Sequence, residues 1–198
     1  MNISLPIAKA QEVSGFERRI EQLLEKSQGY ENTEKILNLI RWESKIPTNL
    51  PCISPLEVPD FRKITISSGY GDRIHPITNE YRHHSGIDIP AKIGDPVYAS
   101  GNGTVLQVEE DALIGKYIRI KHSYGFESIY GHLSQQFVQT GDSIKIGSLI
   151  GAAGNSGRST GPHLHYGVKK NSTEENAYPY CFLLIKIMLN SQREEKNP

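Results

Sequence analysis

The hydrophobic and polar positions divide the chain into a short helical beginning and a long β-rich region. Residues 14–28 carry apolar side chains at helical spacing, and Ser14 and Glu17 have the spacing of a capping box. A second amphipathic helix is predicted from about residue 32 to 43, after a break at Gly29. Two short helices cannot bury their apolar faces alone, so we expect them to pack on each other, on the main domain or on a partner.

Prolines then recur at every fourth position from Pro47 to Pro59. Each ring removes a backbone N–H and biases the preceding residue toward extended geometry, so no helix is expected there. We therefore predict an N-terminal helical segment at 1–46 and a semi-rigid, proline-rich linker at 47–60.

Short strand patterns separated by glycine turns follow the linker and indicate a mainly β domain at 61–182. The clearest pattern is at 117–121, where apolar and polar residues alternate with the period of a half-buried strand. The last residues, 183–198, are expected to form a C-terminal tail that is polar and frayed from residue 191. The predicted strands are 64–66, 86–89, 96–99, 103–108, 117–121, 126–130, 143–146, 149–152 and 163–168.

Charge and composition exclude several classes of protein. The 22 basic and 22 acidic residues cancel and no basic block stands out, which argues against a nucleic-acid partner. No apolar run reaches the length of a membrane-spanning helix, and residues 1–10 lack the pattern of a signal peptide. Cys52 and Cys181 can form one disulfide or none, and nothing in the sequence indicates an oligomeric state.

Glycine and histidine concentrate in the β-rich region. Sixteen of the 18 glycines lie between Gly69 and Gly167, and all seven histidines lie between His75 and His165. A turn-rich region that holds every histidine is where we expect the chemistry.

The first candidate metal motif is His84 with Asp88, four positions apart. On a straight strand these side chains share a face but stand about 13 Å apart. One metal ion cannot bridge that distance, so the segment must bend, and Gly86 permits the bend. The same spacing selects His84 rather than the adjacent His83.

The second motif is the H-x-H of His163 and His165, whose imidazoles share one face of a strand while Leu164 points into the core. Two histidines and one carboxylate form a ligand set of zinc hydrolases, which keep one position open for water. Zinc lowers the pKa of that water to about 7 and polarises a scissile carbonyl. Imidazoles that do not bind the metal would act as general base or oxyanion donor. The candidates, among which spacing does not choose the ligands, are His84, Asp88, His132, His163 and His165.

Other interpretations of these residues stay open at this point. His122 is read as an ordinary strand histidine, and His75 as structural or supporting. Non-haem iron oxygenases also use two histidines and a carboxylate, but commonly at H-x-D spacing. The turns in 138–154 are similar to those of biotinyl and lipoyl carrier domains, with Lys145 near the carrier position, but a carrier would leave the histidines unexplained.

Several motifs together resemble the lysostaphin-like zinc metallopeptidases of family M23, also called LytM or duplicated hybrid motif peptidases. The most specific are SGYGDRIHP at 68–76, HSGID at 84–88 and GNSGRSTGPHLHY at 154–166. The match runs in order over about residues 60–180. Its other parts are 94–99, 103–105, 130–133, 141–144 and 147–151.

The resemblance implies an antiparallel β-sheet fold with a groove over the metal. It implies that His84, Asp88 and His165 bind Zn²⁺ and that His132 and His163 are paired catalytic histidines. The implied activity is hydrolysis of peptide bonds in bacterial peptidoglycan, in cross-links or stem peptides, at an extracytoplasmic location. The alternative is a non-catalytic module that binds the cell wall or activates another hydrolase.

The sequence departs from the family pattern in two places. Tyr166-Gly167 replaces the usual aromatic-Glu pair, and 109–117 lacks the common Gly-Tyr-Gly hairpin, so we expect a different turn there. The loop at 154–161 is expected to form a groove wall, and Tyr98, Tyr130 and Tyr166 are either groove-lining or ordinary strand aromatics. The N-terminal helices are compatible with a stalk, a partner-binding pair or an inhibitory segment over the groove.

Overall fold

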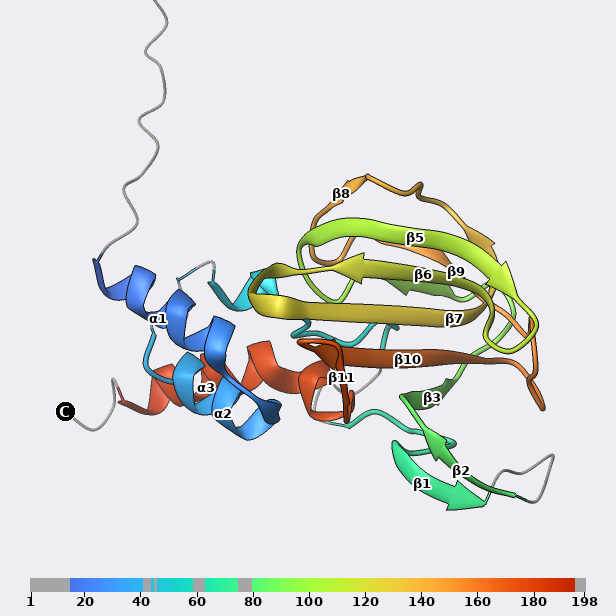
Figure 1. Cartoon of the computed structure of the whole chain (residues 1–198), viewed down its shortest axis with the longest axis horizontal. Coiled ribbons are helices and arrows are strands. Elements are labelled where there is room, and N and C mark those ends of the chain that lie inside the picture. Colours follow the sequence, from blue (N-terminus) through green and yellow to red (C-terminus); the bar gives the residue numbers. More distant parts are fainter. Residues whose placement is uncertain (1–14, 41–43, 45, 59–62, 75–79, 195–198) are drawn as a thin grey trace, which may run out of the picture.

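The computed structural model describes residues 15–40, 44, 46–58, 63–74 and 80–194. These residues form a large antiparallel sheet, a separate two-stranded hairpin and a group of helices at one end of the sheet (Figure 1). The fold is therefore mainly β with N-terminal helices, which confirms the predicted fold class.

The large sheet has nine strands in the order β11-β10-β7-β6-β5-β8, with β3 paired to β10 and with β9 paired to β7 and β4. Residues 63–66 are not in a strand, although the pattern predicted one at 64–66. The other predicted strands are present, and β7 extends well beyond its predicted end. The strands are β3 (Ile87–Pro90), β4 (Pro96–Tyr98), β5 (Gly103–Asp111), β6 (Gly115–Lys121), β7 (Phe126–Gln136), β8 (Ser143–Ile144), β9 (Leu149–Ala153), β10 (His163–Lys170) and β11 (Thr173–Glu175).

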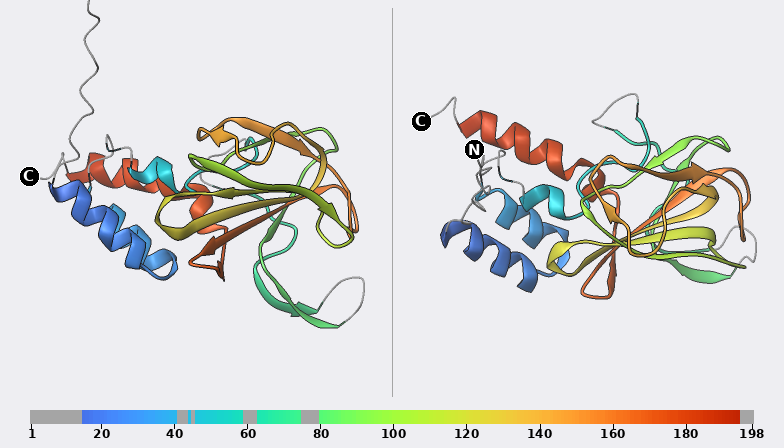
Figure 2. Two further views of the ribbon diagram at one scale, coloured as in Figure 1. Left: turned by 45° about the horizontal axis from the view of Figure 1, so that its top comes forward. Right: turned by 90° about the horizontal axis from the view of Figure 1, so that it is seen from above.

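The separate hairpin consists of β1 (Gly71–Ile74) and β2 (Tyr81–His84), which pair antiparallel. It projects from the body of the molecule on the side of β3 (Figures 1 and 2). The sequence pattern did not predict it, because most of its side chains are exposed and polar, so it lacks the alternation of a half-buried strand.

The helices gather at one end of the sheet, on the side where β10 ends and β11 begins (Figures 1 and 2). In the part of the chain that the structure describes, no helix has both the length and the apolar run needed to cross a membrane. The α-helices are α1 (Gly15–Lys26), α2 (Gly29–Leu37) and α3 (Leu183–Glu194), and the short 3₁₀ helices are η1 (Ile46–Asn49), η2 (Ser123–Gly125) and η3 (Pro179–Phe182).

Helix α1 is confirmed nearly as predicted, whereas α2 begins at Gly29 rather than after Asn32. The backbone N–H of Gly29 donates to Glu175 in β11 at 3.0 Å, a long-range contact that satisfies an N-terminal amide of the helix. The helix ends at Leu37, and residues 38–40 form a turn, so the prediction was wrong for these residues. The rest of its predicted length, 41–43, lies outside the described residues.

The expected C-terminal tail is instead helix α3, which continues through Glu194. Leu183 and Ile187 of α3 are buried in the core, and Lys186 donates to the hydroxyl of Tyr30 in α2 at 3.1 Å. The polar residues after 190 predicted a frayed end, but the buried face of α3 stabilises the helix as a whole.

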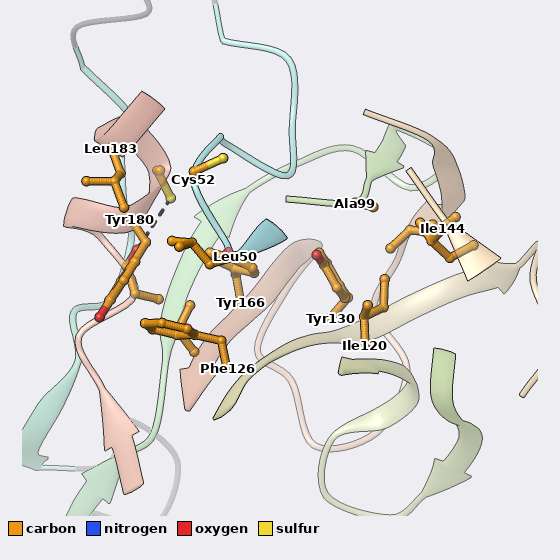
Figure 3. Packing of buried hydrophobic residues seen from close by; sticks show 14 of the residues in the cluster. Leu50, Cys52, Ala99, Ile120, Phe126, Tyr130, Ile144, Tyr166, Tyr180 and Leu183 are labelled. Carbon is orange, nitrogen blue, oxygen red and sulfur yellow. Dashed lines mark hydrogen bonds between the residues drawn. The ribbon is translucent and has the colours of Figure 1, made fainter. Parts of the chain in front are cut away.

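The proline-rich segment is packed into the protein rather than forming a free connector. Leu50 and Cys52 are buried, and the N–H of Cys52 donates to Ser100 O at 2.9 Å (Figure 3). The segment also contains the short helix η1, where no helix was expected. Cys52 and Cys181 are both free, buried thiols, and burial raises the pKa of each well above its usual range.

The core lies between the sheet, the proline-rich segment and the helices, and is filled by aromatic and branched side chains (Figure 3). Tyr130 and Tyr166 are fully buried there, and the backbone N–H of Ser100 donates to the Tyr130 hydroxyl at 2.9 Å. Both tyrosines are therefore strand aromatics of the core and do not line a groove.

Candidate metal centre and active site

Two strands that are adjacent in the sequence and one that is distant bring the candidate ligands together. His84 ends β2, Asp88 lies in β3 and His165 lies in β10, where it is paired directly with Asp88. Among the described residues, these three form a group whose ligand atoms converge closely enough to hold one metal ion.

The geometry of the three ligand atoms fits a small tetrahedral ion. His84 Nε2, Asp88 Oδ1 and His165 Nδ1 lie 3.1 Å from one another on all three sides of a triangle. Ligands bound at about 2.0–2.1 Å in a tetrahedron stand roughly 3.3 Å apart. The triangle therefore matches the spacing of three ligands of one tetrahedral zinc ion.

Gly86, between His84 and Asp88, permits the bend in the chain and also allows a close approach to β10. The strand breaks between His84 and Ile87, as the spacing predicted. A Cβ atom on Gly86 would also lie 2.5 Å from the carbonyl oxygen of Tyr166 and 2.8 Å from Cε1 of His165. The chain can therefore pass beside the His165 ring only with glycine at this position.

Backbone carbonyls fix the orientation of three imidazoles. The Nδ1 atoms of His84, His132 and His163 lie 2.7, 2.7 and 2.8 Å from the carbonyl oxygens of Gly69, Ser156 and Gly161. A carbonyl only accepts, so each Nδ1 carries a proton, and each ring in its neutral form presents the lone pair of its Nε2. For His84 this lone pair points to the ligand triangle.

His132 and His163 form a second pair beside the triangle. Their ring centroids are 4.6 Å apart, and His163 Nε2 lies 3.5 Å from Asp88 Oδ1. The backbone of His132 has a φ of +56°, a conformation that is uncommon for a residue other than glycine. Its N–H donates to Ile114 O at 2.8 Å, so the turn between β5 and β6 helps to hold this conformation.

The charges of the site depend strongly on its burial. Burial alone would raise the pKa of Asp88, but hydrogen bonds with His163, His165 and His84 outweigh it and hold this pKa well below its usual range. Burial lowers the pKa of His132 to about 4 and also lowers the pKa of His165. Burial would lower the pKa of His163 as well, but its contacts with Asp88 and Gly161 raise it instead.

The site opens into a groove with a volume of about 260 Å³. The loop at 154–161 forms part of its wall, as predicted, and Leu113 and Ile114 from the β5–β6 turn form another part. Asp111 accepts from the N–H groups of both these residues at 2.7 and 2.8 Å, which builds the turn between β5 and β6. Tyr98 is not among the lining residues.

The other described histidines, His83 and His122, are not part of the ligand triangle. His122 is buried and lies 2.7 Å from both Asn102 O and Ser128 Oγ, which confirms its structural interpretation. His83 lines the groove but contacts Asp72 and Glu174 instead of the ligand triangle. The prediction that names His75 lies outside the described residues.

Sequence reasoning missed the arginines that line the groove. Arg73 lies 3.8 Å from Asp88 Oδ2, and Arg82 and Arg158 lie along the wall. Arg73 and Arg158 sit inside motifs that the sequence had singled out, so the signal was available. The motifs predicted roles for their histidines and glycines but none for their arginines.

The fold and the site define a β-sheet protein in which two histidines and an aspartate are grouped closely enough to hold a metal ion, with two further histidines beside them. The family model "Peptidase family M23" matches residues 82–177. The catalytic domain of lysostaphin from Staphylococcus simulans is 31% identical with a TM-score of 0.55, and the match covers 61% of this chain and 94% of that domain. The chain belongs to peptidase family M23.

Further relatives agree with this family. Peptidoglycan DD-endopeptidase ShyC of Vibrio cholerae is 40% identical over 124 residues, covering 62% of this chain and 28% of the relative. DD-carboxypeptidase/endopeptidase Mpg of Neisseria meningitidis is 42% identical over 111 residues, covering 56% and 26%. A solved zinc-containing peptidase from Vibrio cholerae is 35% identical with a TM-score of 0.57, covering 64% and 39%. The chain therefore spans less than a third of the length of these two curated relatives.

Proposed function

We propose that this chain is a zinc-dependent endopeptidase that hydrolyses peptide bonds in bacterial peptidoglycan, within cross-links or stem peptides. The observation that carries the proposal is the equilateral triangle of ligand atoms from His84, Asp88 and His165, next to His132 and His163 in an open groove. The names of the relatives, peptidoglycan DD-endopeptidases and a zinc-containing peptidase, support the substrate and the metal.

The residues present fit zinc by their chemistry. Two neutral imidazoles and one carboxylate are ligands that zinc accepts, and Gly69 O holds the His84 ring by its other nitrogen, a support typical of zinc-binding histidines. When bound, Zn²⁺ supplies a polarised carbonyl and a water with a pKa near 7.

His132 and His163 divide the acid–base work in this proposal. Each has its Nδ1–H held by a backbone carbonyl, so each Nε2 is free to exchange a proton on the groove side. One of the two, in its neutral form, accepts the proton of the attacking water at Nε2. The other, with both ring nitrogens protonated, donates a hydrogen bond from Nε2 to the oxyanion that develops on the carbonyl. The histidine that took the proton from the water passes it to the leaving amine as the peptide bond breaks.

The proposal places the protein outside the cytoplasm, because its substrate lies there. The described helices do not restrain the site directly, since they pack at the far end of the sheet and none of their residues lines the groove (Figure 1). This arrangement favours a structural or partner-binding role for α1 and α2 over an inhibitory one.

The test is digestion of purified peptidoglycan, followed by mass spectrometry of the released peptides. We expect new amino termini at one type of peptide bond, loss of cleavage with a chelator and recovery with added Zn²⁺. His84→Ala should lose both the metal and the activity, whereas His83→Ala should retain the metal. A protein that binds zinc but cuts no peptide bond would overturn the proposal in favour of a cell-wall-binding or activating module.

A further inference from the structure

The groove is much more basic than the chain as a whole. The chain has equal numbers of basic and acidic residues. Among the described residues that line the groove, however, there are three arginines and a single carboxylate, that of Asp88. Because Asp88 faces the ligand triangle, no lining carboxylate remains to balance the arginines along the wall. Such a concentration of one charge sign in a cleft selects for the opposite charge in its ligand.

The three arginines differ in how far they are already paired. Arg73 lies 3.8 Å from Asp88, so its charge acts on the metal centre. Arg82 donates through two nitrogens to Glu80, at 3.0 and 2.6 Å. In the part of the chain that the structure describes, no carboxylate lies within ion-pair distance of Arg158. Arg158 is therefore the arginine of the groove that is left for a ligand.

Arg158 is exposed, but its backbone is firmly anchored. Its N–H donates to Leu113 O at 2.9 Å. Two residues earlier, Ser156 Oγ donates to Leu133 O at 2.7 Å and accepts from Lys116 N at 2.9 Å. A Cβ on the intervening Gly157, whose φ is +70°, would lie 2.3 Å from Gly115 N, so the loop is pressed against the start of β6.

The same loop also orients both catalytic candidates. Ser156 O accepts from His132 Nδ1 and Gly161 O accepts from His163 Nδ1. A ligand held by Arg158 is thus positioned by the segment that positions the two histidines, beside the ligand triangle. This arrangement suits a group that flanks the reacting bond.

We propose that Arg158 is a specificity-determining residue that binds a free carboxylate of the substrate, close to the scissile peptide bond. Peptides with such a carboxylate, on a side chain or at a chain end, are then preferred over uncharged peptides of the same length. The planar guanidinium offers two parallel N–H donors to a carboxylate, a geometry that a carboxamide does not match. The inference rests on the proposed peptidase function and names the substrate chemistry of the same site.

The test compares one soluble cross-linked peptide from peptidoglycan with two amidated forms of it. In one form the side-chain carboxylates are carboxamides, and in the other the terminal carboxylate is a carboxamide. The wild type should cleave the unmodified peptide about tenfold more efficiently than one of the two amidated forms, mainly through KM, because a charge-assisted contact at an exposed site is of this size. The form that is cleaved poorly identifies which carboxylate Arg158 reads.

Arg158→Gln should lower this preference to less than about twofold, mainly by raising KM on the unmodified peptide. Arg158→Lys keeps the charge without the planar pair of donors and should retain part of the preference. Arg19→Gln on exposed α1, at the far end of the molecule, makes the same charge change and should leave the preference intact (Figure 1). Thermal melts of all variants should agree with the wild type, since the Arg158 side chain is exposed.

Two results would overturn the inference without touching the proposed function. One is equal cleavage of all three peptides by the wild type, and the other is a preference that Arg158→Gln leaves unchanged. Failure of the wild type to cleave any of the peptides, with its metal bound, would instead contradict the peptidase function and the inference together.

Discussion

The two ends of strand β10 hold buried polar groups for opposite purposes. At the helical end, Lys170 is almost fully buried, and its ammonium group donates to the carbonyl oxygens of Leu24, Glu25 and Tyr124. At the other end, His165 and His163 turn ring nitrogens toward one oxygen of Asp88. The first set is fully satisfied within the protein, whereas the second converges on a point that a ligand can occupy.

This difference shows how one strand can serve both stability and function. The Lys170 ammonium ends helix α1 by satisfying its last carbonyls, and the helix in turn covers that end of the sheet. The histidine end gathers two ring nitrogens and a carboxylate oxygen within 3.1 Å of one another, a set of ligand atoms that a cation can bind. We therefore expect mutations at the two ends to separate stability from metal binding.

The largest expected effect is at the metal end, from Gly86→Ala. The added Cβ would lie within 3 Å of the Tyr166 carbonyl and the His165 ring, so β3 and β10 must move apart and displace a ligand. We expect metal affinity to fall by about 100-fold, measured by competition with a chromogenic chelator. Gly69→Ala is the matched control, because its Cβ meets no atom within 4 Å. Equal affinities for the two variants would show that the close approach is not required.

At the helical end, Lys170→Met should cost stability and leave the metal centre unchanged. The substitution keeps the aliphatic stem but removes the ammonium donor from three carbonyl groups, of which Leu24 O keeps a second donor, Ser27. We expect a cost of about 3 kcal/mol in the free energy of unfolding. Urea unfolding of the metal-free protein measures this cost. Lys169→Met, next to it but partly exposed, should cost less than about 1 kcal/mol. A loss of metal affinity in Lys170→Met would break the proposed separation of the two ends.

A smaller effect comes from His122, a histidine that is buried for structure alone. Burial lowers its pKa from 6.5 to about 4. The unfolded chain therefore takes up a proton between these values before the folded protein does, so stability is complete above pH 6.5 and declines as the pH falls toward 4. Between pH 7 and pH 5 this contributes a loss of about 2 kcal/mol. His122→Gln should remove that part of the acid sensitivity, although it is less stable at pH 7. Unfolding curves at both pH values test this, and an unchanged pH dependence would contradict it.

The metal end was more predictable from the sequence than the helical end. The spacing of His84 and Asp88 required a bend and chose His84 over His83, and the structure places the two residues in this way. Short motifs carry this information, because strand alternation and ligand geometry constrain residues that are close in the sequence.

The helical end depends on contacts between distant residues, which no local pattern reveals. The proline-rich segment contacts both Ser100 and Leu184, and α2 begins at Gly29 because Glu175 meets its first amide. The same limit applies to the groove. Arg158 is part of a recognisable motif, but only the assembled structure shows that no carboxylate among the described residues pairs with it.

The most direct measurement is metal content together with peptidoglycan cleavage for His163→Ala and His132→Ala. The account predicts that each variant retains one zinc ion per chain, because the ligand triangle is intact, and loses about 10²- to 10⁴-fold in cleavage rate. Full cleavage activity with zinc bound in either variant would contradict the role assigned to that histidine. Loss of zinc from either variant would contradict the assignment of the metal to His84, Asp88 and His165 alone.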